Sequence, residues 1–147
     1  MCSLISKGVQ VMLHLNELQE GQELPIHVKK PVTKVQLVKY AGASGDFNPL
    51  HTDDAFAQKI GLPGVIAHGM LVMGFLGEYV NKLAGEVALV KDFKMRFGAM
   101  TFPKDVITCT GTVKSMTVQN GKQVAVLTLT ASKEEQVVGV GEAVLQF

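Results

Sequence analysis

The sequence predicts an α+β domain in which one antiparallel β-sheet wraps around a single long buried helix. Three observations predict this class. Residues 69–83 are apolar on nearly every side of a helix, which is typical of a buried helix. After residue 90 the hydrophobic period changes from helical to two, as in strands. Asn120-Gly121 separates two alternating runs and is a strong hairpin signal. A sheet packed on one apolar helix satisfies all three.

The size, net charge and cysteine content of the chain exclude several classes of protein. The chain has 147 residues, enough for one domain, and 47% are hydrophobic, so a true core can form. The net charge is +1 and no basic block occurs, which argues against nucleic acid binding. Cys2 and Cys109 are too few for a disulfide framework or a multi-cysteine zinc site, so we expect a cytoplasmic protein. The most apolar stretch is too short to cross a bilayer, so no membrane association is expected.

The chain is expected to consist of an N-terminal extension, residues 1–16, and one domain, residues 17–147. The first 12 residues hold one lysine and no arginine, and they lack the apolar run of a secretory signal. Within the domain, alternating apolar residues in 23–30 predict a first strand. Thr33 can then cap a helix whose apolar face is Val35, Leu37, Val38 and Tyr40 and which ends within 42–45.

The next two elements are predicted to be helices. Thr52-Asp53 is a start signal for a short helix that Gly61 ends. The central helix covers 69–83 and ends at Gly85. Gly74 and Gly77 lower its helix propensity, so we expect neighbouring backbone to approach closely there.

The last third of the chain is predicted to form four long antiparallel strands. The alternation assigns three residues of the first strand, Phe93, Met95 and Phe97, to one face. In the second strand Cys109 falls on the buried face, where an inert thiol is expected. The run 124–131 pairs back across the Asn120-Gly121 turn, and 137–147 forms the last strand.

The polar residues with chemical potential lie in two short segments, 44–51 and 66–70. Asp46 and His51 are separated by Asn48-Pro49, and the proline makes this segment a bent loop, not a helical turn. Such a loop can bring a carboxylate and an imidazole together to hold a water and move protons. Taken singly, Asp46 also fits a turn residue and His51 a residue flanking a helix.

Gly69 stands at the predicted start of the buried helix. The first N–H groups of a helix have no helical partner, so they and the positive end of the dipole suit a developing oxyanion. The glycine also fits a role in tight packing alone. His68 beside it fits a structural, hydrogen-bonded histidine. The histidine spacings do not predict a metal site, and no nucleophile elbow or phosphate-binding loop occurs.

These two segments resemble a known signature. Residues 40–51, Tyr-Ala-Gly-Ala-Ser-Gly-Asp-Phe-Asn-Pro-Leu-His, and residues 66–70, Ile-Ala-His-Gly-Met, resemble the motif of the MaoC-like dehydratases. These include (R)-specific enoyl-CoA hydratases and 3-hydroxyacyl-thioester dehydratases. The resemblance covers about residues 17–147 and implies a hot-dog fold, an antiparallel sheet wrapped around a long central helix. It implies the hydration of trans-2-enoyl thioesters, or the reverse dehydration, in fatty-acid metabolism, with no metal or redox cofactor.

The resemblance also implies roles for residues and a partner. Asp46 and His51 would be the catalytic dyad, the Gly69 N–H would bind the thioester carbonyl, and Asn48 and His68 would support them. The substrate would be carried by CoA or acyl carrier protein. The chain resembles homodimeric members, and in a heterodimer it would be the catalytic partner. It departs from the family at Met100, where a proline is common, and at Lys104-Asp105, where Gly-Asp is common.

Two alternatives stay open from the sequence. A hot-dog thioesterase would hydrolyse the acyl thioester, and a non-enzymatic module would only bind it. Thioesterases rarely carry this motif, and a pure binder has no need of a proton-transfer pair. Turnover of an enoyl thioester distinguishes the three.

Overall fold

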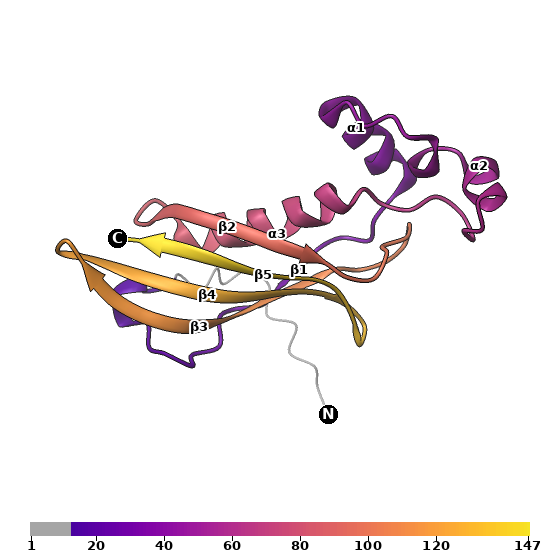
Figure 1. The fold of residues 1–147 in the computed structure, drawn as a ribbon. Coiled ribbons are helices and arrows are strands. Elements are labelled where there is room, and N and C mark those ends of the chain that lie inside the picture. Colours follow the sequence, from indigo (N-terminus) through magenta and orange to yellow (C-terminus); the bar gives the residue numbers. More distant parts are fainter. Residues whose placement is uncertain (1–12) are drawn as a thin grey trace.

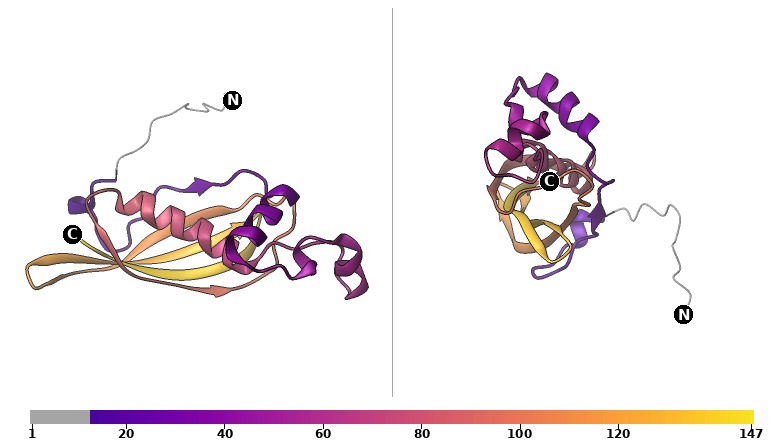
Figure 2. Two further views of the ribbon diagram at one scale, coloured as in Figure 1. Left: turned by 90° about the horizontal axis from the view of Figure 1, so that it is seen from above. Right: turned by 90° about the vertical axis from the view of Figure 1, so that its right-hand side faces the viewer.

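The structure is a computed structural model, and it describes residues 13–147. A five-stranded antiparallel sheet in the order β1-β3-β4-β5-β2 carries helix α3 along one face (Figure 1). The sheet curls around this helix (Figure 2), so the predicted architecture is confirmed. The strands are β1 His27–Val28, β2 Leu89–Phe97, β3 Thr108–Gln119, β4 Lys122–Lys133 and β5 Gln136–Gln146.

Helix α3, Gly69–Ala84, is the centre of the core. Its side chains Leu76, Tyr79 and Val80 are almost fully buried against the sheet, and Gly85 ends the helix as predicted. The prediction that the helix is buried on every side is wrong for one side. Met70 is 56% exposed and Gly74 is exposed, because the sheet covers only the opposite side of the helix.

The two glycines of α3 differ in their surroundings. A Cβ added to Gly77 would lie 3.4 Å from Cε1 of Phe93 on β2, an ordinary contact with a side chain, so the predicted close approach of backbone is wrong there. Nothing lies within 4 Å of a Cβ added to Gly74, so the same prediction is wrong at that position. Gly77 therefore allows the helix to lie against β2, and Gly74 does not take part in this packing.

The inner face of the sheet follows the predicted alternation. Cys109 and Val113 on β3 are buried, as are Leu127 and Leu129 on β4. Asn120 and Gly121 have φ values of 51° and 76°, which a type I′ turn requires, so the predicted hairpin is confirmed. Of the three β2 residues predicted on one face, Phe93 and Met95 pack against the core, whereas Phe97 is 52% exposed.

The strand predicted within residues 23–30 is much shorter in the structure. Only His27–Val28 form β1, and Glu23 makes an isolated bridge to Thr112. Pro25 has no N–H to donate, and its carbonyl accepts a hydrogen bond from the Tyr79 hydroxyl at 2.8 Å. The proline therefore interrupts the ladder and ties this segment to α3 instead.

Helices α1, Lys34–Ser44, and α2, Asp54–Lys59, lie beyond the N-terminal end of α3 (Figures 1 and 2). Their predicted caps are confirmed. Thr33 Oγ1 accepts a hydrogen bond from the Gln36 N–H at 3.1 Å, and Asp53 accepts from two N–H groups of α2. The apolar face predicted for α1 is wrong in part, because Val35 and Val38 are exposed, whereas Leu37 and Ala41, one turn apart, are buried.

The remaining predictions concern the N-terminal extension, the two cysteines and membrane-spanning segments. Cys2 and most of the extension predicted for residues 1–16 lie outside the described residues, while Leu15 is buried in the core. Cys109 is a free, fully buried thiol, and burial raises its pKa to about 11. Within residues 13–147 no helix has the length and apolar character needed to cross a membrane.

Candidate active site

The loop after α1 is folded by its own polar side chains. Gly45 ends α1 in the left-handed conformation, with a φ of 76°, and Ser44 Oγ accepts a hydrogen bond from the Asp46 N–H. One carboxylate oxygen of Asp46, Oδ1, accepts from the Asn48 N–H at 3.2 Å. These bonds turn the chain back on itself, as the proline in this segment predicts.

Asn48 stabilises the next turn of the loop. Its side-chain oxygen accepts from the Leu50 N–H at 3.2 Å and caps the 3-10 helix η2, Pro49–His51. His51 is thereby brought to face Asp46 across the loop. The position of His51 thus depends on Asn48, which agrees with the supporting role that the resemblance implies.

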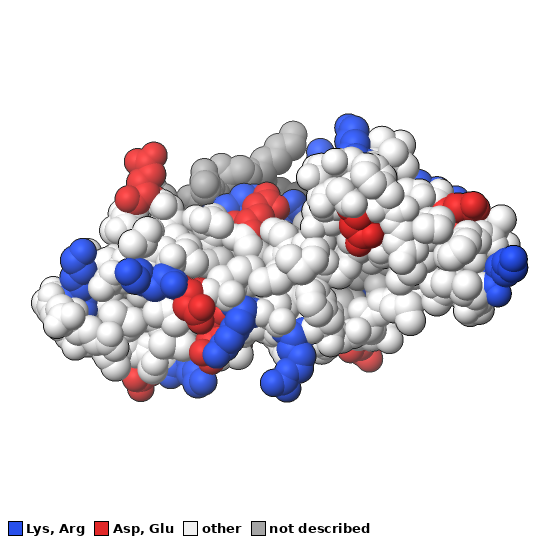
Figure 3. Space-filling view, turned by 45° about the horizontal axis from the view of Figure 1, so that its top comes forward, with Lys and Arg blue, Asp and Glu red and all other residues white. Residues whose placement is uncertain are grey.

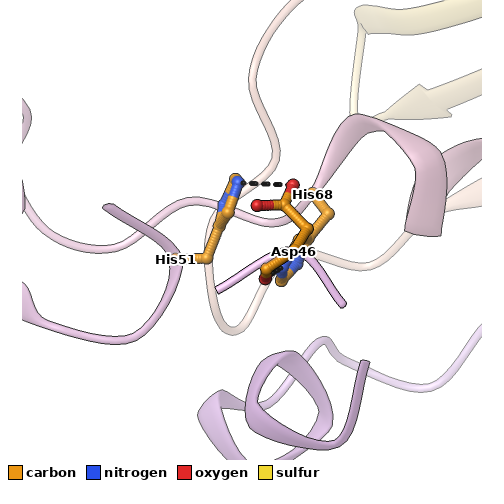
Figure 4. Close-up of side chains that lie close together, drawn as sticks. All are labelled: Asp46, His51 and His68. Carbon is orange, nitrogen blue, oxygen red and sulfur yellow. Dashed lines mark hydrogen bonds and ion pairs between the residues drawn. The ribbon is translucent and has the colours of Figure 1, made fainter. Parts of the chain in front are cut away.

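Asp46 and His51 face each other across the loop (Figure 4). His51 Nε2 lies 3.7 Å from Asp46 Oδ2, which is longer than a direct hydrogen bond. His51 Nδ1 lies 2.7 Å from the Ile66 carbonyl oxygen. Because a carbonyl can only accept, Nδ1 carries a proton, and Nε2 is the ring nitrogen directed towards Asp46. The His51 side chain is 11% exposed and that of Asp46 is 52% exposed, so solvent reaches the carboxylate.

His68 touches both members of this pair. Its ring stacks on the His51 ring with centroids 3.8 Å apart and an interplanar angle of 22°. Its Nε2 donates to the Asp46 carbonyl oxygen at 3.1 Å, and Tyr40 packs edge-on against its other side. His68 is 2% exposed. His68 is therefore a buried residue that holds the ring of His51 and the backbone of Asp46 in place.

Gly69 follows directly and is the first residue of α3. Among residues 13–147, no carbonyl or side chain accepts a hydrogen bond from its N–H. The first turn of α3 has no acidic residue, so its positive dipole end is not neutralised there. The Phe97 ring lies against the glycine: a Cβ added to Gly69 would lie 3.1 Å from Phe97 Cε1. The absence of a side chain leaves this N–H accessible at an exposed position.

The two segments of the site are joined by backbone hydrogen bonds. The Ile66 N–H donates to the Leu50 carbonyl at 3.2 Å, and the Ala67 N–H donates to the Thr101 carbonyl at 2.7 Å. The structure thus brings Asp46, His51 and His68 together, with Asn48 inside the same loop and Gly69 next to His68. The Ile66 carbonyl and the Tyr40 and Phe97 rings also border the site and were not predicted to do so from the sequence. A backbone carbonyl leaves no signal in a sequence, and the two rings meet the site through the tertiary fold.

One ligand atom from each of Asp46, His51 and His68 lies within 4.8 Å of the others, which is close enough for a metal ion. The geometry favours proton transfer over metal binding. Metal ligation needs both imidazole lone pairs to converge in the ring planes, and here the two rings are stacked. The His68 Nε2 is already used by the Asp46 carbonyl.

Two hollows of the surface lie away from this site. A hollow of about 730 Å³ at the end of the sheet is lined by residues 104–106, 108 and 133–136, and one of about 400 Å³ lies over β2, β4 and β5. Neither is lined by Asp46, His51 or Gly69. The candidate site therefore lies at the junction of α1, η2 and α3, outside both hollows.

Comparison with known proteins gives the family. Residues 16–136 match the MaoC like domain. The chain belongs to this family. It is 28% identical over 134 residues to an (R)-specific enoyl-CoA hydratase of Rhodospirillum rubrum, covering 90% of each chain. The solved structure of an (R)-hydratase of Aeromonas caviae involved in PHA biosynthesis matches with a TM-score of 0.77 and 27% identity, covering 88% of this chain and 96% of that one.

A longer relative matches only in part. The chain is 39% identical over 66 residues to the fatty acid synthase β subunit TOXC of Cochliobolus carbonum, which is 44% of this chain and 3% of that protein. The resemblance to the MaoC-like dehydratases and the hot-dog fold that it implies are both confirmed.

Proposed function

We propose that this protein is a hydro-lyase that adds water to trans-2-enoyl thioesters with (R) stereochemistry and catalyses the reverse dehydration of 3-hydroxyacyl thioesters. The observation that carries the proposal is the pair Asp46 and His51, in which an imidazole nitrogen and a carboxylate oxygen face each other at 3.7 Å. Membership of the MaoC-like family and similarity to two (R)-specific hydratases support the same reaction.

The dyad handles water and both protons. A water oxygen can hydrogen-bond to both His51 Nε2 and Asp46 Oδ2, because each atom can accept one of its protons. In the hydration direction this oxygen attacks C3 of the enoyl group while the dyad takes a proton from it. The electron pair of the C2–C3 double bond moves towards the thioester oxygen. The dyad then returns a proton to C2, so water is added and no cofactor is consumed. General acid–base assistance of this kind contributes about 10²–10⁴-fold.

Gly69 supplies the oxyanion donor in this proposal. Negative charge develops on the thioester oxygen, and the Gly69 N–H at the positive end of α3 is the unpaired donor beside the dyad. One such donor contributes about 3 kcal/mol to the stability of the transition state. The neighbouring Phe97 ring and the exposed Met70 side chain offer apolar surface for the acyl group.

Asn48 and His68 act as supports in the same proposal. Asn48 caps η2 and so determines where His51 lies. His68 holds the Asp46 backbone and stacks on the His51 ring, which limits the rotation of both groups. Neither contacts the reacting atoms.

We propose that the active form is a homodimer and that the acyl site is completed at its interface. Within residues 13–147 the long edge strand β2 pairs only with β5, and the exposed side of α3 carries Met70. Phe47, beside Asp46 in the chain, is 69% exposed. Light scattering after size exclusion should give twice the chain mass at micromolar concentration. A strict monomer would contradict the homodimer, and if the chain pairs with a second kind of subunit, it supplies the dyad.

The thioester carrier is CoA or acyl carrier protein. Lysines, arginines and acidic residues are intermixed over the face of the molecule in Figure 3, without a block of one sign. We also propose a cytoplasmic location, on the ground that Cys109 is a free thiol, and a domain of residues 17–147 preceded by an extension of residues 1–16.

Hydration, thioester hydrolysis and mere binding give different readouts. With crotonyl-CoA the proposal predicts loss of enoyl-thioester absorbance, release of no free thiol, and (R)-3-hydroxybutyryl-CoA as product. Enoyl-CoA of longer chain and crotonyl-acyl carrier protein complete the substrate panel. Release of free thiol as the main reaction would favour a thioesterase, and binding without turnover of any substrate would favour a binding module.

A further inference from the structure

The connection between β2 and β3 is held by a lysine from another strand. Lys133, the last residue of β4, lies with its ammonium 2.7 Å from Asp105 Oδ2 and 2.7 Å from the Met100 carbonyl oxygen. The ammonium also lies 4.8 Å from the centre of the Phe102 ring. The Lys133 side chain is 14% exposed and that of Asp105 25%. The lysine of this pair is therefore much less open to solvent than Lys94 and Lys114, which pair with Glu142, while the two carboxylates are equally exposed.

Asp105 closes the turn that Lys133 holds. Its Oδ2 also accepts a hydrogen bond from the Phe102 N–H at 2.8 Å, and its own N–H donates to the Phe102 carbonyl. Lys104, between them, has a φ of 77°, a left-handed conformation that favours glycine. A lysine keeps this conformation only where neighbouring contacts impose it. The ion pair of Asp105 with Lys133 is one of these contacts.

This turn is attached to both halves of the candidate active site. The Thr101 carbonyl, inside the connection, accepts from the Ala67 N–H at 2.7 Å, and Ala67 immediately precedes His68. At its other end the Lys104 N–H donates to the Val32 carbonyl at 2.7 Å, and the Val32 N–H donates to the Asp105 carbonyl at 2.9 Å. Val32 is followed by Thr33, the N-cap of α1, and α1 ends at the loop that holds Asp46.

We propose that Lys133, through its pair with Asp105, is a positioning residue that fixes His68 and Gly69 relative to the dyad. This inference rests on the proposed function. Lys133 contacts neither the dyad nor Gly69 and acts through Met100, Asp105 and Thr101. Lys133 also lines the hollow of about 730 Å³, but its ammonium is already bound by Asp105 and the Met100 carbonyl, so it is not free to bind a ligand there.

The test compares Lys133→Met with Lys133→Arg and with a matched control. Small displacements of groups that act in the transition state lower kcat more than KM. We expect Lys133→Met to lower kcat by about 10- to 100-fold and to change KM by less than about twofold. Lys133→Arg keeps the charge and the donors and should restore kcat to within about threefold of wild type. Lys114→Met, which removes the same group from the exposed pair with Glu142, should leave kcat unchanged.

A second readout does not depend on turnover. Hydrogen exchange of the peptide that contains Ala67 should be faster in Lys133→Met than in wild type, while exchange in β4 and β5 stays the same. Asp105→Asn, which can keep the bond from the Phe102 N–H, should show the same local change if Lys133→Met fails to fold. Unchanged exchange at Ala67, or kcat for Lys133→Met equal to that of Lys114→Met, would overturn the inference. If wild type hydrates no enoyl thioester, the proposed function fails, and the exchange data still decide whether Lys133 fixes this segment.

Discussion

Gly69→Ala separates the catalytic role of Gly69 from its role in packing. The new Cβ would lie 3.1 and 3.2 Å from two atoms of the Phe97 ring, so the ring or the first turn of α3 must move by a few tenths of an ångström. Phe97 is 52% exposed and can turn outwards. The methyl group would also stand at the exposed surface where we propose that the thioester oxygen approaches the Gly69 N–H.

The expected effects on activity and on stability differ in size. A fully lost oxyanion donor costs about 3 kcal/mol, or about 100-fold in rate. Because the N–H is hindered and not removed, we expect kcat for crotonyl-CoA to fall by about 10- to 100-fold. The free energy of unfolding should change by less than about 1 kcal/mol, because alanine favours the helix and the exposed ring can move aside.

The assay is steady-state hydration combined with urea unfolding. Gly42→Ala is the matched control, because Gly42 lies within α1 and nothing stands within 4 Å of an added Cβ. This control should gain about 0.5–1 kcal/mol of stability and keep its kcat. A Gly69→Ala protein with the kcat of wild type would refute the oxyanion assignment, and a loss of stability large enough to explain the rate would refute the separation of the two roles.

Two further predictions concern stability and thiol chemistry. The Glu78 carboxylate binds Lys29 and Lys82, and the hydrogen bond from Lys29 lowers its pKa, so its stabilising effect is full at neutral pH and lost as the pH falls through the lowered value. Because this site is partly open to solvent, Glu78→Gln should lower the free energy of unfolding by only about 0.5 kcal/mol at pH 7. Urea titrations should show that this loss becomes smaller below pH 4.5. A loss that does not change with pH would contradict the ion pair. Burial raises the pKa of Cys109 to about 11, so its thiol should not react in the folded protein. In a Cys2→Ser protein, Ellman's reagent at pH 8 should therefore detect one thiol only after unfolding. Rapid reaction in the native state would contradict the burial of Cys109.

The helix caps, the hairpin turn and the central helix could be predicted from short stretches of the sequence. Thr33 and Asp53 cap the two helices as expected, Asn120-Gly121 forms the hairpin, and the long apolar run forms α3. These features depend on hydrogen bonds and φ values within a few residues, which a sequence encodes directly. The two motif segments likewise indicated the residues that the structure brings together.

Features that depend on distant contacts could not be predicted. The pairing of β2 with β5 and the attachment of the β2–β3 connection to Ala67 join residues far apart in the chain. Val35 and Val38 are apolar but exposed, because only one narrow side of α1 meets the rest of the protein. Met100 and Lys104-Asp105, where the chain departs from the family, lie in the β2–β3 connection, and its hydrogen bonds to both halves of the site leave no signal in the sequence.

The most direct test of the account compares hydration of crotonyl-CoA by wild type, Asp46→Asn and His51→Ala at equal concentration. Circular dichroism should show that both variants fold. Asp46→Asn keeps the volume of its side chain and should melt at the temperature of wild type, whereas His51→Ala removes a buried ring that stacks on His68 and should melt at a lower temperature. The account predicts turnover by wild type and a loss of at least about 10²-fold in kcat for each variant, because the proton-transfer pair is broken. Near-normal turnover by either variant would contradict the dyad on which the proposed function depends.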